Sequence, residues 1–396
     1  MNTVFFFQVF RILVTPSNVG HISGIDCLLK LTKPLNLSFF KEIMFSVGLV
    51  GLPNAGKSTL FNLVTKMSVP AENFPFCTIE PTSGIVYVPD ERVEVLATMS
   101  NSQKKVLATI EFRDIAGLVK NAHQGAGLGN QFLSHIREVD LILLVIRTFE
   151  NEQIVHVENR VSPQEDEEIL LLELMLADQN TLEKMLPKLQ REVRSGDQLS
   201  LDKLSLVEEL LNRLTNLQLA RSLVLDPTLD KELIKWRKSL NLLTDKPILR
   251  LANVNYGGKN HNYSADVYMD VKLELELQDA SMEERQALDL PVEKPMDLLI
   301  RKCYQTLNLG TFLTTGRTET RAWTFPLGWL APKCAGIIHS DFEKTFINAE
   351  VISYHDLLVA GGWKEAAEAG KLRIEGKNYL MQDGDVVEFR VGAQAK

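Results

Sequence analysis

Residues 51–58 read Gly-x-x-x-x-Gly-Lys-Ser, a spacing that can hold the phosphates of a nucleotide. The glycines at both ends of the loop let backbone N–H groups turn inward on a phosphate chain. Lys57 is placed to reach the β- and γ-phosphates, and the Ser58 hydroxyl to ligate Mg²⁺. An apolar run before the loop and a helix-forming run after it supply the strand and the positive helix end that such a loop needs. The predicted nucleotide-binding residues of this loop are Asn54, Ala55, Gly56, Lys57, Ser58 and Thr59.

A second motif closes a later strand-like run. Asp114 stands three residues before Gly117, in an Asp-x-x-Gly spacing. At this distance from a phosphate-binding loop, Asp114 is expected in the Mg²⁺ shell, and the Gly117 amide is expected to sense the γ-phosphate. Thr78 lies where a switch threonine closes on Mg²⁺ and the γ-phosphate, and a loop threonine without a ligand role is the alternative. The predicted metal ligands are Ser58, Thr78 and Asp114.

The residue after Gly117 is Leu118, where Ras-like enzymes usually carry a glutamine that orients the attacking water. A leucine cannot orient water by hydrogen bonding, so another group must do so or the intrinsic rate is very low. His123 is the best candidate, because its imidazole can accept from water or donate to the γ-phosphate. An exposed loop histidine without a role is the competing interpretation. Lys57 and His123 are therefore the predicted catalytic residues.

Base recognition departs from the guanine-specific pattern Asn-Lys-x-Asp, whose Asp accepts from guanine N1 and N2. The matching strand end has Asn253 and Val254 but Tyr256 at the Asp position. Without that carboxylate the main penalty against adenine is absent, so strict GTP specificity is not expected. These three residues are the predicted base-side contacts. Asn54 has two interpretations, a ligand of K⁺ beside the phosphates and a simple turn asparagine.

Short apolar runs separated by helix-forming segments must position these residues. Interleaved with helices, such runs predict a parallel sheet with helices on both faces, an α/β fold. After about residue 318, short strands and turns predict a small β-rich α+β domain. The apolar runs cover residues 45–50, 85–88, 106–112, 141–146 and 247–252.

Between the fourth and fifth runs the pattern becomes helical. Apolar residues recur at helical spacing on either side of the polar turn 194–197. This predicts an inserted hairpin of two antiparallel helices, although two ordinary core helices fit the same spacing. The recurring positions are Leu182, Leu186, Leu189, Val193, Leu204, Val207, Leu211 and Leu214.

Length and composition bound the class of protein. The chain has 396 residues, enough for roughly two or three domains. Its net charge of −8 does not suggest a dedicated nucleic-acid coat, although one domain could still carry a basic face. The 4 cysteines form no CxxC pair, so reduced thiols in a cytoplasmic compartment are the simplest interpretation. No apolar run reaches the about 18 residues of a membrane span.

The motifs together resemble one known family, the YchF or Obg-like ATPases. The likeness runs from about residue 44 to 392. The matching segments are GLVGLPNAGKSTLFN (48–62), NFPFCTIEP (73–81), DIAGLV (114–119), GAGLGNQFL (125–133), RAWT (321–324), AGIIHSDFEK (335–344) and QDGDVV (382–387).

The resemblance implies a Ras-like P-loop nucleotide-binding domain, an inserted α-helical coiled-coil hairpin and a C-terminal β-grasp-like TGS domain. It also implies a hydrolase that prefers ATP, uses Mg²⁺, binds ribosomes and is linked to stress responses. The family's switch histidine aligns with His123. A cytoplasmic monomer without membrane association is expected. Basic residues that would then contact ribosomal RNA phosphates are Lys333, Lys344, Lys371, Arg373 and Lys377.

The expected domain boundaries follow from these patterns. The nucleotide domain covers residues 44–155 and 245–318, the helical insertion covers 156–244, and the TGS domain covers 319–396. Residues 1–43 have no counterpart in the family. They are expected to be either a poorly ordered leader or an upstream start-codon misassignment.

The chain departs from the family around the base. The family's Asn-x-x-Glu ends in Tyr256 here, the following loop 257–262 is atypical, and the base loop reads Asp-Val-Lys at 270–272. Two functions therefore stay open. One is a Mg²⁺-dependent ATPase, with GTP as a second candidate substrate, that switches conformation on ribosomes. The other is a ribosome-binding scaffold whose hydrolysis is vestigial. The intact phosphate motifs favour the enzyme.

Overall fold

The structure, a computed structural model, describes residues 44–69, 82–115, 128–153, 160–226, 231–291 and 293–392. For residues 128–132 and 195 it describes the backbone alone. The described residues belong to one unit, residues 42–396. The extension predicted over residues 1–43 lies outside the described part, as do Thr78, Gly117, Leu118 and His123.

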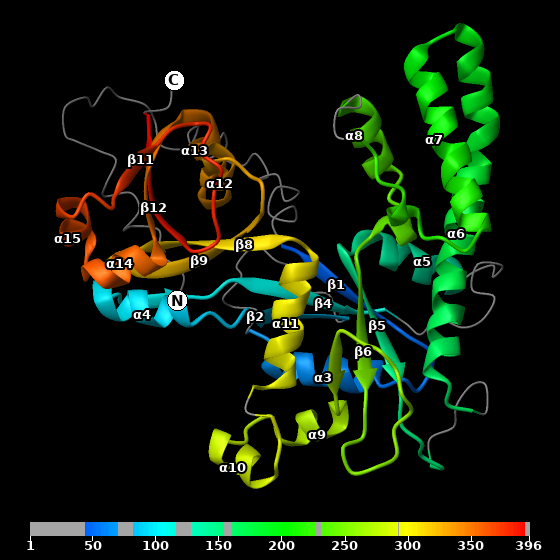
Figure 1. Ribbon diagram of the computed structural model, residues 1–396, viewed down its shortest axis with the longest axis horizontal. Helices are drawn as coiled ribbons and strands as arrows, with labels where there is room; N and C mark the ends of the chain where they lie inside the picture. The colour runs from blue at the N-terminus through cyan, green and yellow to red at the C-terminus, as the bar shows by residue number, and fades with distance from the viewer. Residues whose placement is uncertain are drawn as a thin grey trace, which may run out of the picture. The chain divides into compact units, whose positions relative to one another are not determined.

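A six-stranded sheet forms the centre of the nucleotide-binding domain (Figure 1). Its order is β2-β4-β1-β5-β6-β7, and every neighbouring pair is parallel except β2 and β4. The apolar runs predicted as buried strands form five of these strands, which confirms the predicted α/β fold. The strands are β1 (Ser46–Val50), β2 (Ser83–Tyr87), β4 (Thr109–Asp114), β5 (Leu141–Arg147), β6 (Ile248–Asn253) and β7 (Val267–Met269).

Both faces of this sheet are covered, as β5 shows. Leu141, Leu143 and Val145 pack into one core cluster, while the alternate residues of the strand pack into a second. Side chains of a strand alternate between its faces, so a strand with no exposed residue must be covered on both sides. The helices of this domain are α3 (Lys57–Met67), α4 (Glu91–Ser100), α5 (Leu128–Glu138), α9 (Val271–Glu276), α10 (Met282–Ala287) and α11 (Pro295–Thr306).

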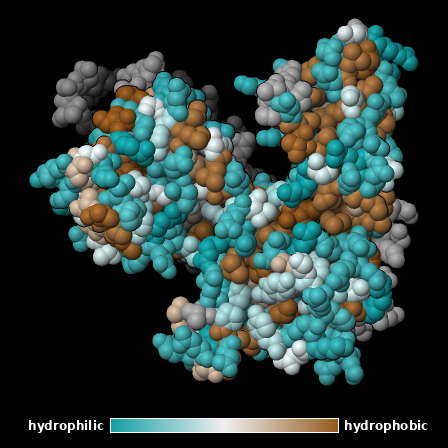
Figure 2. Space-filling model, viewed as in Figure 1, coloured by the Kyte–Doolittle hydropathy of each residue, from teal (hydrophilic) through white to brown (hydrophobic). Residues whose placement is uncertain are grey.

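A helical arm follows β5. Its helices α6 (Pro163–Glu192) and α7 (Gln198–Thr215) lie side by side and share a leucine-rich core (Figure 1). The turn between them contains Gly196 at φ 79°, and the Asp197 side chain caps α7 by accepting from the Ser200 N–H. The predicted pair of packed helices is thus present. Helix α8 (Lys231–Ser239) completes the arm. Hydrophobic residues gather on the face of the arm that Figure 2 shows.

A second six-stranded sheet has the order β11-β10-β12-β8-β9-β3. Apart from β3, its strands come from residues 309–391, so the predicted boundary at residue 319 falls between β8 and β9 of one sheet. Its strands are β3 (Lys104–Val106), β8 (Leu309–Thr315), β9 (Glu319–Pro326), β10 (Phe346–Ser353), β11 (Arg373–Glu375) and β12 (Asp385–Val391). Its helices are α12 (Ala331–Ile338), α13 (Ser340–Thr345), α14 (Tyr354–Ala360) and α15 (Trp363–Glu368).

Strand β3 connects the nucleotide-binding domain with the C-terminal sheet. The sequence predicts one strand over residues 106–112, but the structure divides this region. Strand β4 enters the first sheet, while β3 pairs in parallel with β9 of the second. The preceding helix α4 adds an ion pair of 3.0 Å between Arg92 and Asp383. The nucleotide-binding domain and the C-terminal sheet therefore share backbone hydrogen bonds. Among the helices described, none is both long and apolar enough to cross a membrane.

Candidate nucleotide-binding site

The loop after β1 has the backbone that a phosphate-binding loop needs. Gly56 has φ 106°, a left-handed conformation that favours glycine, and a Cβ there would lie 2.2 Å from Asn253 Nδ2. At Gly51 a Cβ would lie 2.5 Å from the Val145 carbonyl oxygen. Helix α3 begins at Lys57 without a side-chain cap, so its first N–H groups face the loop as anion donors. The two glycines are thus required by close contacts to β5 and β6.

Lys57 is a buried cation, with 7% of its surface exposed. Its Nζ donates to the Leu52 carbonyl at 2.8 Å. Burial lowers the pKa of Lys57 to about 8, and the nearby Asp114 carboxylate opposes that shift. A polyanion bound in the loop would favour the charged form, because an opposite charge stabilises an ammonium group. The lysine is therefore set to bind a phosphate chain.

Asp114 lies beside the loop because β4 pairs in parallel with β1. The register places it opposite Leu49, at the carboxyl end of β1. Burial raises the pKa of Asp114, and Lys57 opposes the rise. Ser58, in the first turn of α3, is exposed. A carboxylate and a hydroxyl are the hard oxygen donors that Mg²⁺ prefers, so these two residues fit that ion.

Asn253 connects the phosphate loop with the base side. Its Nδ2 donates to the Ala55 carbonyl at 2.9 Å, and its Oδ1 accepts from the Val271 N–H at 3.3 Å. The side chain is buried, with 6% of the residue exposed. Ala55 is also buried, so its part in the site is to accept this hydrogen bond through its backbone carbonyl. One amide thus links the loop after β1 to the start of α9.

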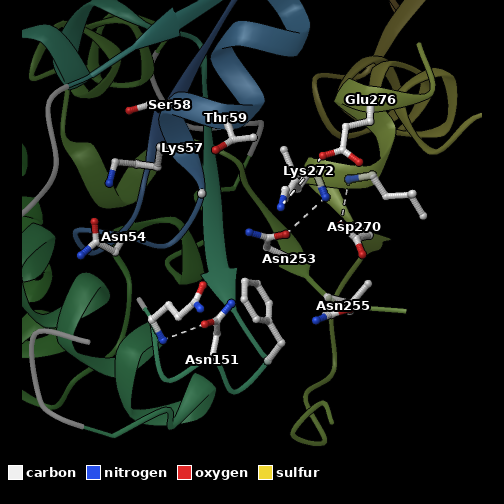
Figure 3. A pocket seen from close by; sticks show the side chains of 16 residues that line it. Asn54, Lys57, Ser58, Thr59, Asn151, Asn253, Asn255, Asp270, Lys272 and Glu276 are labelled. Carbon is white, nitrogen blue, oxygen red and sulfur yellow. Dashed lines mark hydrogen bonds and ion pairs between the residues drawn. The ribbon is translucent and has the colours of Figure 1, made fainter. Parts of the chain in front are cut away.

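These elements enclose a cavity of about 580 Å³, a usual volume for a small-ligand pocket (Figure 3). The P-loop and α3 form one end. The ends of β5 and β6 and helix α9 form the rest. The lining residues are Asn54, Gly56, Lys57, Ser58, Thr59, Phe149, Asn151, Gln153, Asn253, Val254, Asn255, Asp270, Val271, Lys272, Leu273 and Glu276.

The structure brings most of the predicted site residues to this cavity. Seven of the predicted positions line it: Asn54, Gly56, Lys57, Ser58, Thr59, Asn253 and Val254. Sequence reasoning missed the segment after β5, which contributes Phe149, Asn151 and Gln153. The available signal was that β5 is a parallel strand, whose carboxyl end shares one edge of the sheet with the P-loop.

Tyr256 is not among the lining residues. It is 45% exposed, and its N–H donates to Asp270 Oδ2 at 3.2 Å. Burial raises the pKa of Tyr256, and the carboxylates of Glu274 and Asp270 add to the rise. The phenol therefore stays neutral at ordinary pH and supplies no carboxylate at the position that reads guanine in guanine-specific enzymes.

The fold and this site define a P-loop nucleotide hydrolase of the GTPase class. Residues 46–176 match the MMR_HSR1 family, described as a 50S ribosome-binding GTPase. Residues 309–392 match the YchF-GTPase_C family, described as a protein of unknown function.

Similar whole chains identify the family. The chain is 46% identical over 368 residues to the "Ribosome-binding ATPase YchF" of Mycoplasma genitalium, covering 88% of this chain and 99% of that one. It is 44% identical over 364 residues to the protein of that name from Bacillus subtilis, covering 87% and 98%. The solved structure titled "Structure of the Schizosaccharomyces pombe YchF GTPase" matches with a TM-score of 0.76 and 34% identity, covering 88% and 98%. The chain belongs to the YchF family, as its motifs indicate.

Proposed function

We propose that the protein is a Mg²⁺-dependent ATPase that binds ribosomes and acts as a regulatory switch in translation and stress responses. The observation that carries the proposal is the buried Lys57 ammonium, which lies in one cavity with Ser58 and the base-side Asn253. The bacterial relatives named above are called ribosome-binding ATPases. Because ribosomes lie in the cytoplasm, we propose a cytoplasmic location for a protein that binds them. We also propose that it is a monomer.

The residues of the cavity, the neighbouring Asp114 and three residues of the predicted switch segments divide the chemistry. Lys57 and the N–H groups of the loop hold the β- and γ-phosphates and stabilise charge on the transferred phosphoryl group. Ser58 and Asp114 would hold Mg²⁺, which supplies further neutralisation of phosphate charge when bound. Thr78 would complete that shell, the Gly117 amide would contact the γ-phosphate, and His123 would orient the attacking water in place of a glutamine. The last three assignments concern residues outside the described part of the chain.

ATP is proposed as the preferred nucleotide, with GTP as a weaker substrate. Guanine specificity needs a carboxylate at N1 and N2, and Tyr256 provides none. Of the carboxylates that line the cavity in the described part of the chain, Asp270 accepts from the backbone N–H groups of Tyr256 and Leu273. The other, Glu276, lies 4.0 Å from the ammonium of Lys272. Asn253, Val254 and Asn255 offer groups that an adenine can also use.

Asn54 supports a proposal about K⁺. It has φ 63°, is exposed and lines the phosphate end of the cavity. A side-chain carbonyl there could hold a monovalent cation beside the phosphates. Equal hydrolysis rates in potassium and sodium buffers at equal ionic strength would remove the ion from the mechanism and leave Asn54 as a turn residue.

Ribosomal RNA is the proposed contact of the C-terminal domain. Lys333 is exposed and lies 3.6 Å from the centre of the Trp329 ring, which combines a cation with an aromatic face. Lys344, Lys371, Arg373 and Lys377 are the other proposed phosphate contacts.

Two measurements test the proposal. Titration calorimetry with ATP and GTP analogues and Mg²⁺ should give tighter ATP binding. Tighter GTP binding would move the protein to the GTPase side. Co-sedimentation with ribosomes should then depend on the bound nucleotide.

A specific observation keeps one alternative open. Tyr256 stands where the family has Glu, and this difference favours the hypothesis that the protein is a ribosome-binding scaffold with vestigial hydrolysis. Such a scaffold would co-sediment equally with and without nucleotide, and it would bind ATP and GTP equally weakly. The buried Lys57 argues for the enzyme, because burying a cation is costly and a scaffold has no need of one in a cavity.

A further inference from the structure

A buried ion pair lies behind the wall of the nucleotide cavity that α9 forms. The Arg285 guanidinium on α10 donates to both Glu274 oxygens on α9, at 3.1 and 2.8 Å. The side chains of Arg285 and Glu274 are 0% and 4% exposed. A buried pair of this kind is a weak source of stability, because removing both charges from water costs about what their attraction returns. Its two-point geometry needs another explanation.

Helix α9 is too short to hold its own position. It has six residues, fewer than the about 12 that a helix needs to be stable alone. One face, with Lys272 and Glu276, lines the cavity and is exposed to solvent (Figure 3). At its start, Val271 is buried and its N–H donates to Asn253 Oδ1, the same amide that holds the P-loop.

Helix α9 also packs against α3, and the ion pair on its buried face adds a contact that can set its rotation. Apolar packing alone lets a single turn of helix rotate or slide by small steps, whereas a two-point hydrogen bond between planar groups does not. Glu274 lies between Lys272 and Glu276 in the chain, so a shift at Glu274 moves both cavity-lining side chains. Arg285 itself is not among the cavity-lining residues.

We propose that Arg285 is a positioning residue for the nucleotide. Through Glu274 it fixes the rotation and register of α9, and thereby the places of Lys272, Glu276 and the Val271 N–H beside the base and ribose. The inference rests on the proposed nucleotide site and names a residue that acts on it from behind.

The two ends of the cavity respond differently under this proposal. The P-loop residues Asn54 and Gly56–Thr59 form the phosphate end, and α9 forms part of the opposite, base-side wall. Loss of the register of α9 should therefore weaken binding of the nucleoside part of ATP. Binding of the phosphates should stay unchanged. Inorganic tripolyphosphate, which has no base or ribose, reports on the phosphate end alone.

The test uses the full chain with Mg²⁺ and titration calorimetry. The double variant Glu274→Leu/Arg285→Met removes both charges at similar volume and should keep the wild-type unfolding temperature. We expect its dissociation constant for ATP to rise about tenfold, a usual loss for a displaced binding group, with tripolyphosphate affinity and kcat at saturating ATP unchanged. Arg285→Lys, which keeps the charge but not the two-point geometry, should shift the ATP constant in the same direction.

Arg237→Lys is the matched control. Arg237 donates to both oxygens of Asp245 at 3.2 and 2.9 Å at the base of the arm, and neither residue lines the cavity. This variant should bind ATP like the wild type.

An unchanged ATP constant in a folded double variant and in Arg285→Lys would overturn the inference. Equal losses for ATP and tripolyphosphate would also overturn it, because the pair would then support the whole domain. A wild-type protein that binds neither ligand would instead refute the proposed function.

Discussion

Replacing Gly56 by alanine tests how the phosphate loop is built. Gly56 and Gly196 both have positive φ, 106° and 79°. A Cβ at Gly196 meets nothing within 4 Å, whereas a Cβ at Gly56 would lie 2.2 Å from Asn253 Nδ2. The pair Gly56→Ala and Gly196→Ala therefore separates backbone strain, which both variants share, from displacement of the Asn253 amide, which only one suffers.

The magnitudes can be worked from these contacts. Alanine at positive φ costs about 1–2 kcal/mol in either variant. Displacing Asn253 also leaves the buried Ala55 carbonyl and the Val271 N–H without their partner, at about 1–3 kcal/mol for each group. We therefore expect Gly56→Ala to lose about 3 kcal/mol more free energy of unfolding than Gly196→Ala. This difference corresponds to roughly 6–12 °C in unfolding temperature for a domain of this size.

Scanning calorimetry and ATP titration measure the two consequences. Gly196→Ala should unfold a few degrees below the wild type and bind ATP with unchanged affinity. Gly56→Ala should unfold at a lower temperature still and lose at least about tenfold in ATP affinity, because the loop amides no longer converge on the phosphates. If Gly56→Ala binds ATP like the wild type and is no less stable than Gly196→Ala, the Asn253 amide does not hold the loop.

Three further predictions follow from the structure and the proposed mechanism. Because burial lowers the pKa of Lys57 to about 8 and a bound phosphate favours its charged form, ATP binding above pH 8 should take up protons, seen as a buffer-dependent enthalpy, and Lys57→Met should abolish the uptake. Asp178 is fully buried and accepts from the Leu243 N–H and from the N–H and hydroxyl of Thr244, so Asp178→Ala should lower the free energy of unfolding in urea by about 3 kcal/mol, while a loss below about 1 kcal/mol would contradict this account. His123→Ala should slow ATP turnover by about 100-fold with unchanged ATP affinity, and wild-type turnover would exclude the histidine from water positioning.

The phosphate end of the site could be predicted from the sequence because its determinants are local. The conformation of residues 51–58 depends on glycines, on the strand before them and on the helix after them, and all of these are contiguous in the chain. The same holds for the buried strands and for the two helices of the arm, whose apolar spacing carries the helical period.

The base side of the site could not be predicted in the same way, because it is built from segments that are far apart in the chain. Phe149, Asn151 and Gln153 reach the cavity only because β5 lies between β1 and β6 in the sheet. Tyr256 occupies the motif position that reads the base, but its backbone is held by Asp270 and it lies outside the lining. A linear motif shows which residue holds a position, whereas side-chain packing decides where that residue points.

Strand order separates most clearly what the sequence determined from what the tertiary structure decided. The sequence determined the α/β class, the P-loop, its lysine and serine, and the membership of the chain in a family. Only the tertiary structure decided that β3 pairs with β9 of the C-terminal sheet and that Arg285 holds α9 from behind the cavity. Strand pairing and buried ion pairs join residues that are distant in the chain, and neither leaves a periodic signal in the sequence around them.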